Sequence, residues 1–142
     1  MGNEVFLTVV IPAYNEEKRL PETLKKIHEY LAKKNFTYEI IVVDDGSRDG
    51  TIKVAESFQE LEPGLRVLRN PRNMGKGFTV RNGMLNGRGK LLLFTDSDLS
   101  TPIEDFDKFL PQFEKGYDVV IGSRALEESD IKVSQPIHRV IM

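Results

Sequence analysis

Two aspartates with a single residue between them follow an apolar run. The segment 94–101 reads FTDSDLST, so Asp96 and Asp98 come directly after the apolar residues 91–94. Carboxylates in i, i+2 positions at the end of a strand can face one cation, and their hard oxygens suit Mg²⁺ or Mn²⁺, which also bridges phosphate oxygens. A DxD pattern is common by chance, and a loop with an aspartate cap is the alternative. The wholly apolar strand before it favours a metal site.

A second acidic segment, DDGS at 44–47, also follows an apolar run. It is compatible with a plain turn, because Asp-Gly favours turns. It is also compatible with a phosphorylated acidic cluster, or with recognition of a nucleobase or ribose by an aspartate. A response regulator would place its acidic pair nearer the chain start and would need a later lysine after a strand. That lysine is missing, so we discount this class.

The segment NMGKG at 73–77 is similar to half of a phosphate-binding loop. Gly75 and Gly77 are expected to present backbone N–H groups at a helix start, and Lys76 adds a cation. The spacing is not that of a P-loop, and alone the segment would indicate a simple loop. Beside an acidic pair it predicts a neighbour of a pyrophosphate.

Strand-like and helix-like segments alternate along the chain. Strands are predicted at 6–11, 38–43, 65–69, 90–94 and 117–122, and helices lie around 20–31, at 51–61, from the glycine-rich turn to about 86, and at 101–116. This order predicts an α/β fold with a mostly parallel sheet and helices on both faces. Ligands bind outside the carboxyl ends of such strands, where the polar segments fall. Residues 125–142 are not assigned.

Composition restricts the class of protein. The chain has 142 residues, which fits one domain, with 20 Lys and Arg against 22 Asp and Glu, a formal net charge of −2. A nucleic-acid binder usually carries a basic surplus, so that class is disfavoured. The absence of cysteine excludes disulfides, thiolate catalysis and Cys-ligated zinc. No apolar run reaches the length of a membrane span.

Five segments in order resemble one family. VVIPAYNEEKRL, VVDDGSRDGT, NMGKG, FTDSDLS and VVIGSR are similar to the family 2 glycosyltransferases, which have the GT-A (Rossmann-like) fold of nucleotide-diphospho-sugar transferases. Within that family the chain looks most like the dolichyl-phosphate glucosyltransferase branch and its prokaryotic polyprenyl-phosphate relatives. The resemblance implies a single nucleotide-sugar-binding domain over 1–142, with the C-terminal acceptor-side part missing.

The resemblance also implies roles for individual residues. Asp96 and Asp98 match the metal-binding pair, with Asp98 and Arg124 at the catalytic centre, and Lys132 and Arg139 are further candidates to meet the acceptor phosphate. The positions that match the nucleotide site are Pro12, Ala13, Tyr14, Glu16, Asp44, Asp45, Gly46, Ser47, Lys76, Arg81, Asp96 and Ser97.

The implied reaction is transfer of a hexose, with inversion, from UDP-glucose to dolichyl or polyprenyl phosphate, assisted by Mg²⁺ or Mn²⁺. It would take place at the cytoplasmic face of a membrane, with homo-oligomers as a further expectation. The alternatives are GDP-mannose as donor, a saccharide acceptor, or a donor-binding fragment without turnover. A haloacid-dehalogenase-like phosphatase is disfavoured, because its DxDx[ST] signature should follow the first strand and here follows the fourth.

Overall fold

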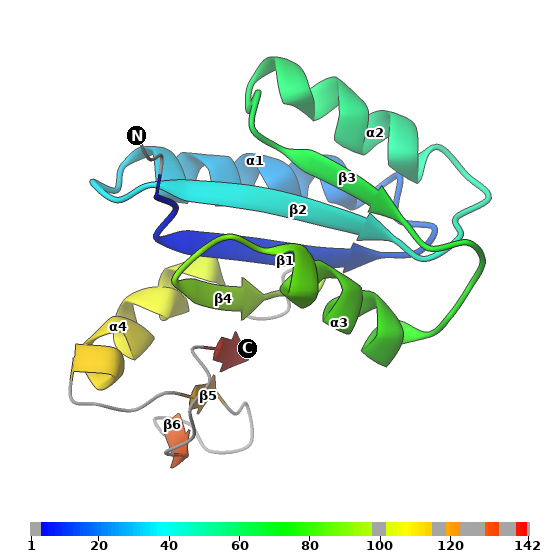
Figure 1. Cartoon of the computed structure of the whole chain (residues 1–142). Coiled ribbons are helices and arrows are strands. Elements are labelled where there is room, and N and C mark those ends of the chain that lie inside the picture. The colour runs from blue at the N-terminus through cyan, green and yellow to red at the C-terminus, as the bar shows by residue number, and fades with distance from the viewer. Residues whose placement is uncertain (1–3, 98–101, 115–118, 123–129, 134–138, 142) are drawn as a thin grey trace.

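The computed structural model describes residues 4–97, 102–114, 119–122, 130–133 and 139–141 (Figure 1). They form a seven-stranded sheet in the order β3-β2-β1-β4-β7-β5-β6. The strands are β1 (Leu7–Ala13), β2 (Tyr38–Asp44), β3 (Arg66–Arg69), β4 (Leu91–Phe94), β5 (Val119–Gly122), β6 (Asp130–Val133) and β7 (Arg139–Ile141). The helices are α1 (Leu20–Ala32), α2 (Thr51–Ser57), α3 (Lys76–Asn86) and α4 (Phe106–Glu114), with 3₁₀ turns η1 (Phe58–Glu60) and η2 (Ile103–Asp105).

Strand β1 has parallel neighbours on both sides. Ala13 pairs with Asp44 of β2, and Val10 pairs with Phe94 of β4. Three strands therefore end at the same edge of the sheet, and the loops that follow them start side by side. The predicted α/β fold with a mostly parallel sheet is confirmed, and β5–β6 is the antiparallel pair among the described strands.

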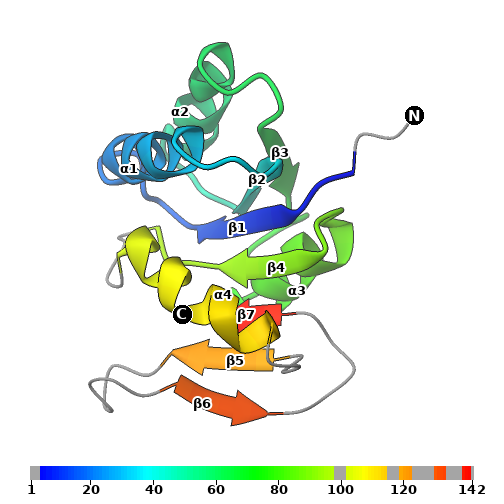
Figure 2. The same cartoon turned by 90° about the vertical axis from the view of Figure 1, so that its left-hand side faces the viewer.

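Helices cover both faces of the sheet, as Figure 2 shows for α1 and α2 on one side and α3 on the other. Alternate residues of β1 define the two cores. Val9 and Ile11 belong to the larger core with α1 and α4, whereas Val10 packs with Met84 of α3. Because both faces are buried, the strands are apolar throughout rather than alternating.

Helix α3 lies unusually close to the sheet at Gly83. A Cβ placed there would lie 2.3 Å from Cγ1 of Val10 and 2.9 Å from Cγ2 of Val43. Both methyl groups belong to stiff, buried β-branched side chains that cannot rotate away. Glycine at this position sets the distance between α3 and the sheet, and therefore the place where α3 begins.

A buried carboxylate holds the opposite end of the sheet together. Glu39 accepts hydrogen bonds from the Thr8 hydroxyl at 2.7 Å, the Arg88 amide at 2.6 Å and the Arg66 guanidinium at 3.1 Å. Burial alone would raise the pKa of Glu39, but these donors outweigh burial and lower it. This cluster joins β1, β2 and β3 far from the loops that follow the strands.

Several predicted boundaries change. The helix expected at 51–61 ends at Ser57 and continues as the 3₁₀ turn η1. Its N-cap residue is Gly50, and Asp49, just before the cap, accepts the Thr51 amide at 2.9 Å. The helix expected at 101–116 begins as η2, and Thr101, the first residue of the expected helix, lies outside the described residues. The unassigned region supplies β6 and β7. Within the part of the chain that the structure describes, no helix is both long enough and apolar enough to cross a bilayer.

We predict that Gly83→Ala lowers the free energy of unfolding by about 1–3 kcal/mol, because the added methyl group overpacks the core. Urea denaturation followed by circular dichroism measures this change. Gly77→Ala is the matched control on the same helix, since a Cβ at Gly77 meets nothing within 4 Å. Equal effects of the two substitutions would contradict the close approach at Gly83.

Candidate active site

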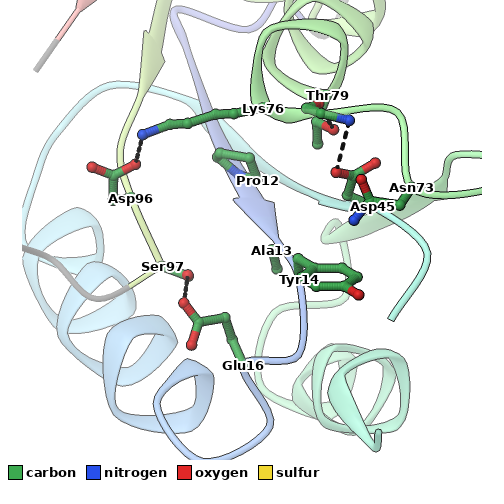
Figure 3. A pocket seen from close by; sticks show the side chains of 11 residues that line it. Pro12, Ala13, Tyr14, Glu16, Asp45, Asn73, Lys76, Thr79, Asp96 and Ser97 are labelled. Carbon is green, nitrogen blue, oxygen red and sulfur yellow. Dashed lines mark hydrogen bonds and ion pairs between the residues drawn. The ribbon is translucent and has the colours of Figure 1, made fainter. Parts of the chain in front are cut away.

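A pocket of about 470 Å³ opens at the edge where β1, β2 and β4 end (Figure 3). Its walls are the end of β1, the loops after these three strands, the loop before α3 and the first turn of α3. The lining residues are Pro12, Ala13, Tyr14, Glu16, Asp45, Asn73, Gly75, Lys76, Thr79, Asp96 and Ser97. The predicted gathering of polar segments at one edge of the sheet is therefore observed.

The loops after β1 and β2 are fastened to each other by reciprocal hydrogen bonds. The Asn15 amide donates to Ser47 Oγ at 2.8 Å, and the Arg48 amide donates to Asn15 Oδ1 at 2.9 Å. Asn15 has a φ of 52°, a left-handed conformation that asparagine tolerates better than most residues. This turn carries Tyr14 to the lip of the pocket, where the residue is 43% exposed.

Asp44 is buried at the end of β2 and has one oxygen without a partner. Its Oδ2 accepts the amides of Gly46 at 3.1 Å and Ser47 at 2.9 Å. Its Oδ1 is the one buried side-chain polar atom that lacks a hydrogen bond among the described residues. Buried acceptors are normally satisfied, so this oxygen marks a place where a ligand donor would be stabilised. Asp44 borders the pocket residues Ala13 and Asp45 without lining the pocket itself.

Asp45 organises the pocket loop that precedes α3. Its carboxylate accepts the Met74 amide at 2.7 Å, the Gly75 amide at 3.1 Å and the Asn70 side chain at 2.9 Å. Burial would raise the pKa of Asp45, but these hydrogen bonds outweigh burial and hold the pKa below its usual range. The Gly75 amide, which the sequence predicted to face a phosphate, is thus engaged by Asp45.

Gly46 lets the loop after β2 touch the loop before α3. Its φ is +81°, and a Cβ there would lie 2.8 Å from the Asn73 nitrogen and 2.9 Å from the Arg72 carbonyl carbon. The backbone of the β2 loop therefore packs directly on the backbone of the loop before α3. Glycine is required here by both the conformation and the contact.

Lys76 and Asp96 meet across the pocket. Lys76 Nζ lies 2.5 Å from Asp96 Oδ1, with side chains 60% and 33% exposed (Figure 3). Lys76 is the first residue of α3, and Asp96 follows β4 by two residues. A cation and a carboxylate thus face the same space, and the partial exposure of both leaves the pair free to rearrange around a ligand.

Glu16 ties the β1 loop to the acidic segment. Its Oε2 accepts the Ser97 hydroxyl at 2.6 Å (Figure 3). Its Oε1 accepts Arg19 Nε at 2.8 Å. The Glu16 amide also donates to Thr51 Oγ1 at 2.8 Å. Arg19 balances the charge of this carboxylate, which otherwise would oppose an anionic ligand in the pocket.

The carboxylates at the pocket fit a divalent ion that is coordinated by the protein and by a bound ligand together. No group of three or more His, Cys, Asp or Glu side chains gathers anywhere in the described residues. Among the three carboxylates that line the pocket, Asp96 is paired only with the exposed Lys76, whereas Glu16 and Asp45 are bound by the residues that shape the loops. Mg²⁺ and similar ions are commonly held by one or two carboxylates together with substrate phosphates, so Asp96 suits this mode of binding.

The structure brings most of the predicted nucleotide residues to the pocket or its border. Arg81 is exposed on α3 and does not line the pocket, and Asp44, Gly46 and Ser47 shape the loop beside it. Asp98 and Arg124 lie outside the described residues, as do the side chains of Lys132 and Arg139. Asn73 and Thr79 line the pocket but were not predicted as site residues. Asn73 belongs to the NMGKG segment, and Thr79 follows Lys76 by three residues on the same face of α3.

The sequence matches a known family model over most of its length. The model for glycosyl transferase family 2 matches residues 8–140. The chain belongs to glycosyltransferase family 2. This confirms the family that the five segments resemble.

Curated relatives of this family 2 chain act on lipid phosphates according to their names. A dolichyl-phosphate beta-glucosyltransferase of Trichomonas vaginalis is 40% identical, over 98% of this chain and 46% of the relative. The Drosophila melanogaster enzyme of the same name is 42% identical over 96% and 46%. An undecaprenyl-phosphate 4-deoxy-4-formamido-L-arabinose transferase of Pseudomonas fluorescens is 38% identical over 81% and 34%. The chain spans about half the length of the curated dolichyl-phosphate relatives it matches.

Solved structures agree with the GT-A fold of this family 2 chain. A mannosyltransferase from Pyrobaculum calidifontis, in complex with GDP-Man and Mn²⁺, superposes with a TM-score of 0.68 at 24% identity, over 82% of this chain and 34% of that one. Residues 1–349 of S. aureus TarS, in complex with UDP-GlcNAc, give a TM-score of 0.64 at 28% identity, over 84% and 35%.

We predict that Asp45→Asn destabilises the native state by about 1–3 kcal/mol near neutral pH, because buried amides lose their charged acceptor. Because the pKa of Asp45 is lower in the native than in the unfolded state, its charged carboxylate stabilises the native state at pH values above the unfolded pKa of about 3.9. This stabilisation is lost as the pH falls through the native pKa. The gap in unfolding free energy between wild type and Asp45→Asn should therefore narrow below about pH 4. Urea titrations from pH 6 to pH 3 measure it.

Asp105→Asn is the control, since Asp105 makes one long surface ion pair with Lys108 at 3.5 Å. It should change the unfolding free energy by less than about 0.5 kcal/mol. A gap for Asp45→Asn that stays constant over the whole pH range would contradict the assigned shift.

Proposed function

We propose that this chain is the donor-binding part of a hexosyltransferase that moves a sugar, with glucose favoured, from a UDP sugar to dolichyl or polyprenyl phosphate. The observation that carries the proposal is the pocket in which Lys76 and Asp96 face one another at the carboxyl edge of a family 2 sheet. Such a pair offers both a cation for phosphate oxygens and a carboxylate for a divalent ion. Membership of the family supplies the reaction class.

The nucleoside end of the donor is proposed to lie against the loops after β1 and β2. Tyr14 provides an exposed ring at the lip, and aromatic faces stack well on bases. The unpartnered Asp44 Oδ1 would accept an N–H of the base or a ribose hydroxyl. A uridine donor is favoured because the TarS complex, at 28% identity, contains UDP-GlcNAc.

The diphosphate end is proposed to lie between Lys76 and Asp96. Lys76 would move from Asp96 to a phosphate oxygen, which its exposure and flexible stem allow. Asp96, with Asp98 as its proposed partner, would hold Mg²⁺ or Mn²⁺. When bound, such an ion neutralises the charge that develops on the leaving nucleoside diphosphate.

The acceptor is proposed to be a polyprenyl phosphate at the cytoplasmic face of a membrane. Dolichyl phosphate and undecaprenyl phosphate, named for the relatives, are both polyprenyl phosphates. A phosphate oxygen is already anionic at neutral pH, so it can attack the anomeric carbon without a strong general base, and direct displacement inverts that carbon. Arg124 is the proposed partner of the acceptor phosphate. The absence of cysteine is compatible with the cytosol.

We predict that UDP binds this chain in a Mn²⁺-dependent manner and that Asp96→Ala weakens binding in the presence of Mn²⁺ by at least about tenfold. Isothermal titration calorimetry with UDP and GDP, each with and without Mn²⁺, measures this. Asp105→Ala is the matched control, because Asp105 is also 33% exposed and also pairs with a lysine. It should bind UDP as wild type does.

Each arm of this experiment decides a different part of the proposal. Tighter binding of GDP would change the donor and keep the site. Mn²⁺ dependence that survives in Asp96→Ala would remove Asp96 from the metal site. A folded wild-type chain that binds neither nucleotide would overturn the donor-binding proposal itself.

We predict that Lys76→Met weakens UDP binding by about tenfold, the order expected for loss of one charge-assisted contact. The same calorimetric titration measures it. Lys90→Met is the matched control, because Lys90 is 68% exposed and pairs with Glu4 at 3.5 Å at the far end of the sheet. Equal UDP affinity for Lys76→Met and wild type would place the diphosphate elsewhere.

A further inference from the structure

Thr23 on α1 makes an unusual hydrogen bond. Its hydroxyl donates to the backbone oxygen of Ser97, a residue 74 positions later in the chain. A threonine inside a helix more often bonds the carbonyl oxygen four residues earlier, or points to solvent. Thr23 is only 4% exposed, and it occupies a core-facing position among Leu20, Leu24 and Ile27. A buried hydroxyl at such a position needs a partner, and the partner is the segment that follows β4.

Ser97 is held at its backbone oxygen and at its hydroxyl. Its backbone oxygen accepts from Thr23, and its own hydroxyl donates to Glu16 Oε2 at 2.6 Å. Glu16 and Ser97 both line the pocket, whereas Thr23 lies on α1 and does not line it. Ser97 is 5% exposed, so its groups are shielded from water, and each hydrogen bond carries more weight than at the surface.

Asp96 lies between two fixed points. On one side the Thr95 amide donates to the Val10 oxygen at 3.0 Å, which continues the pairing of β4 with β1. On the other side Ser97 is bound by Thr23 and Glu16. Because Asp96 lies between two anchored residues, its backbone position is fixed. Its side chain stays 33% exposed at the pocket.

We infer that Thr23 is a positioning residue that, together with Glu16, holds Ser97 and thereby aims the Asp96 carboxylate at the donor pocket. Thr23 touches no part of the pocket and acts only through Ser97. Glu16, for which a nucleotide contact is also proposed, joins this function with its second oxygen, so that the β1 loop and the acidic segment move as one unit. The inference rests on the proposed function for its ligand and on described contacts for its geometry.

The test replaces the hydroxyl without changing the volume. Thr23→Val is close to isosteric and removes only the donor, whereas Thr23→Ser keeps the donor and is the conservative rescue. The ratio of UDP dissociation constants without and with Mn²⁺ is measured by calorimetry for each variant. Thr23→Val should reduce this ratio about three- to tenfold, the effect of one lost buried hydrogen bond, and Thr23→Ser should restore most of it. UDP affinity without Mn²⁺ should stay within about twofold of wild type, since Thr23 does not contact the donor.

A second measurement needs no ligand. Hydrogen–deuterium exchange of the free protein should be faster in Thr23→Val than in wild type for the peptide that contains Thr95 to Ser97. Thr8→Val is the matched control, because Thr8 is also fully buried and bonds Glu39 at the opposite end of the sheet. Thr8→Val should lower the free energy of unfolding. It should not change the ratio of UDP dissociation constants without and with Mn²⁺, and it should not speed exchange of the peptide with Thr95 to Ser97 beyond what global unfolding accounts for.

The outcomes separate the inference from the function on which it rests. An unchanged Mn²⁺ ratio in Thr23→Val, or a change of equal size in Thr8→Val, overturns the positioning role while the proposed function stands. Unchanged local exchange in Thr23→Val also overturns it. A wild-type chain with no Mn²⁺-dependent UDP binding instead overturns the metal-assisted function, and with it the purpose assigned to Thr23.

Discussion

The parallel pairing of β1 with both β2 and β4 is the constraint on which the site depends. Ala13 stands beside Asp44, and Val10 stands beside Phe94, so three chain segments leave the sheet at one edge. Without this register, the pocket would not be shared by Tyr14, Glu16, Asp45, Asp96 and Ser97. Gly83 contributes from the face of the sheet that α3 covers, because the close approach of α3 brings Lys76 to the same edge.

The pocket contains three carboxylates, although the proposed donor is an anion. Each is compensated in a different way. Asp45 is surrounded by amide donors, Glu16 is paired with Arg19, and Asp96 faces Lys76. Two of these carboxylates thus serve the architecture of the loops, and the third remains available to a ligand. This division would allow an acidic edge to accept the proposed diphosphate.

The sequence was sufficient to predict the first five strands, the mostly parallel sheet and the edge where the polar segments gather, because apolar periodicity and turn residues are local signals. It did not predict β6 and β7. It was not sufficient for the contacts between loops. The bond from Thr23 to Ser97 and the bonds from Asp45 to Met74 and Gly75 join residues far apart in sequence, and only the folded chain brings them together. The catalytic roles of Asp98 and Arg124 stay predictions.

The backbone contact at Gly46 has a consequence for redesign. Beside the pocket, Gly46 packs main chain against main chain on residues 72–73, so a side chain at position 46 would push these two loops apart. Tyr14, by contrast, is a large side chain at the lip with nearly half of its surface exposed. An engineer who wishes to admit a bulkier ligand would therefore begin at Tyr14, where volume can be removed without disturbing the loops that hold the site in place.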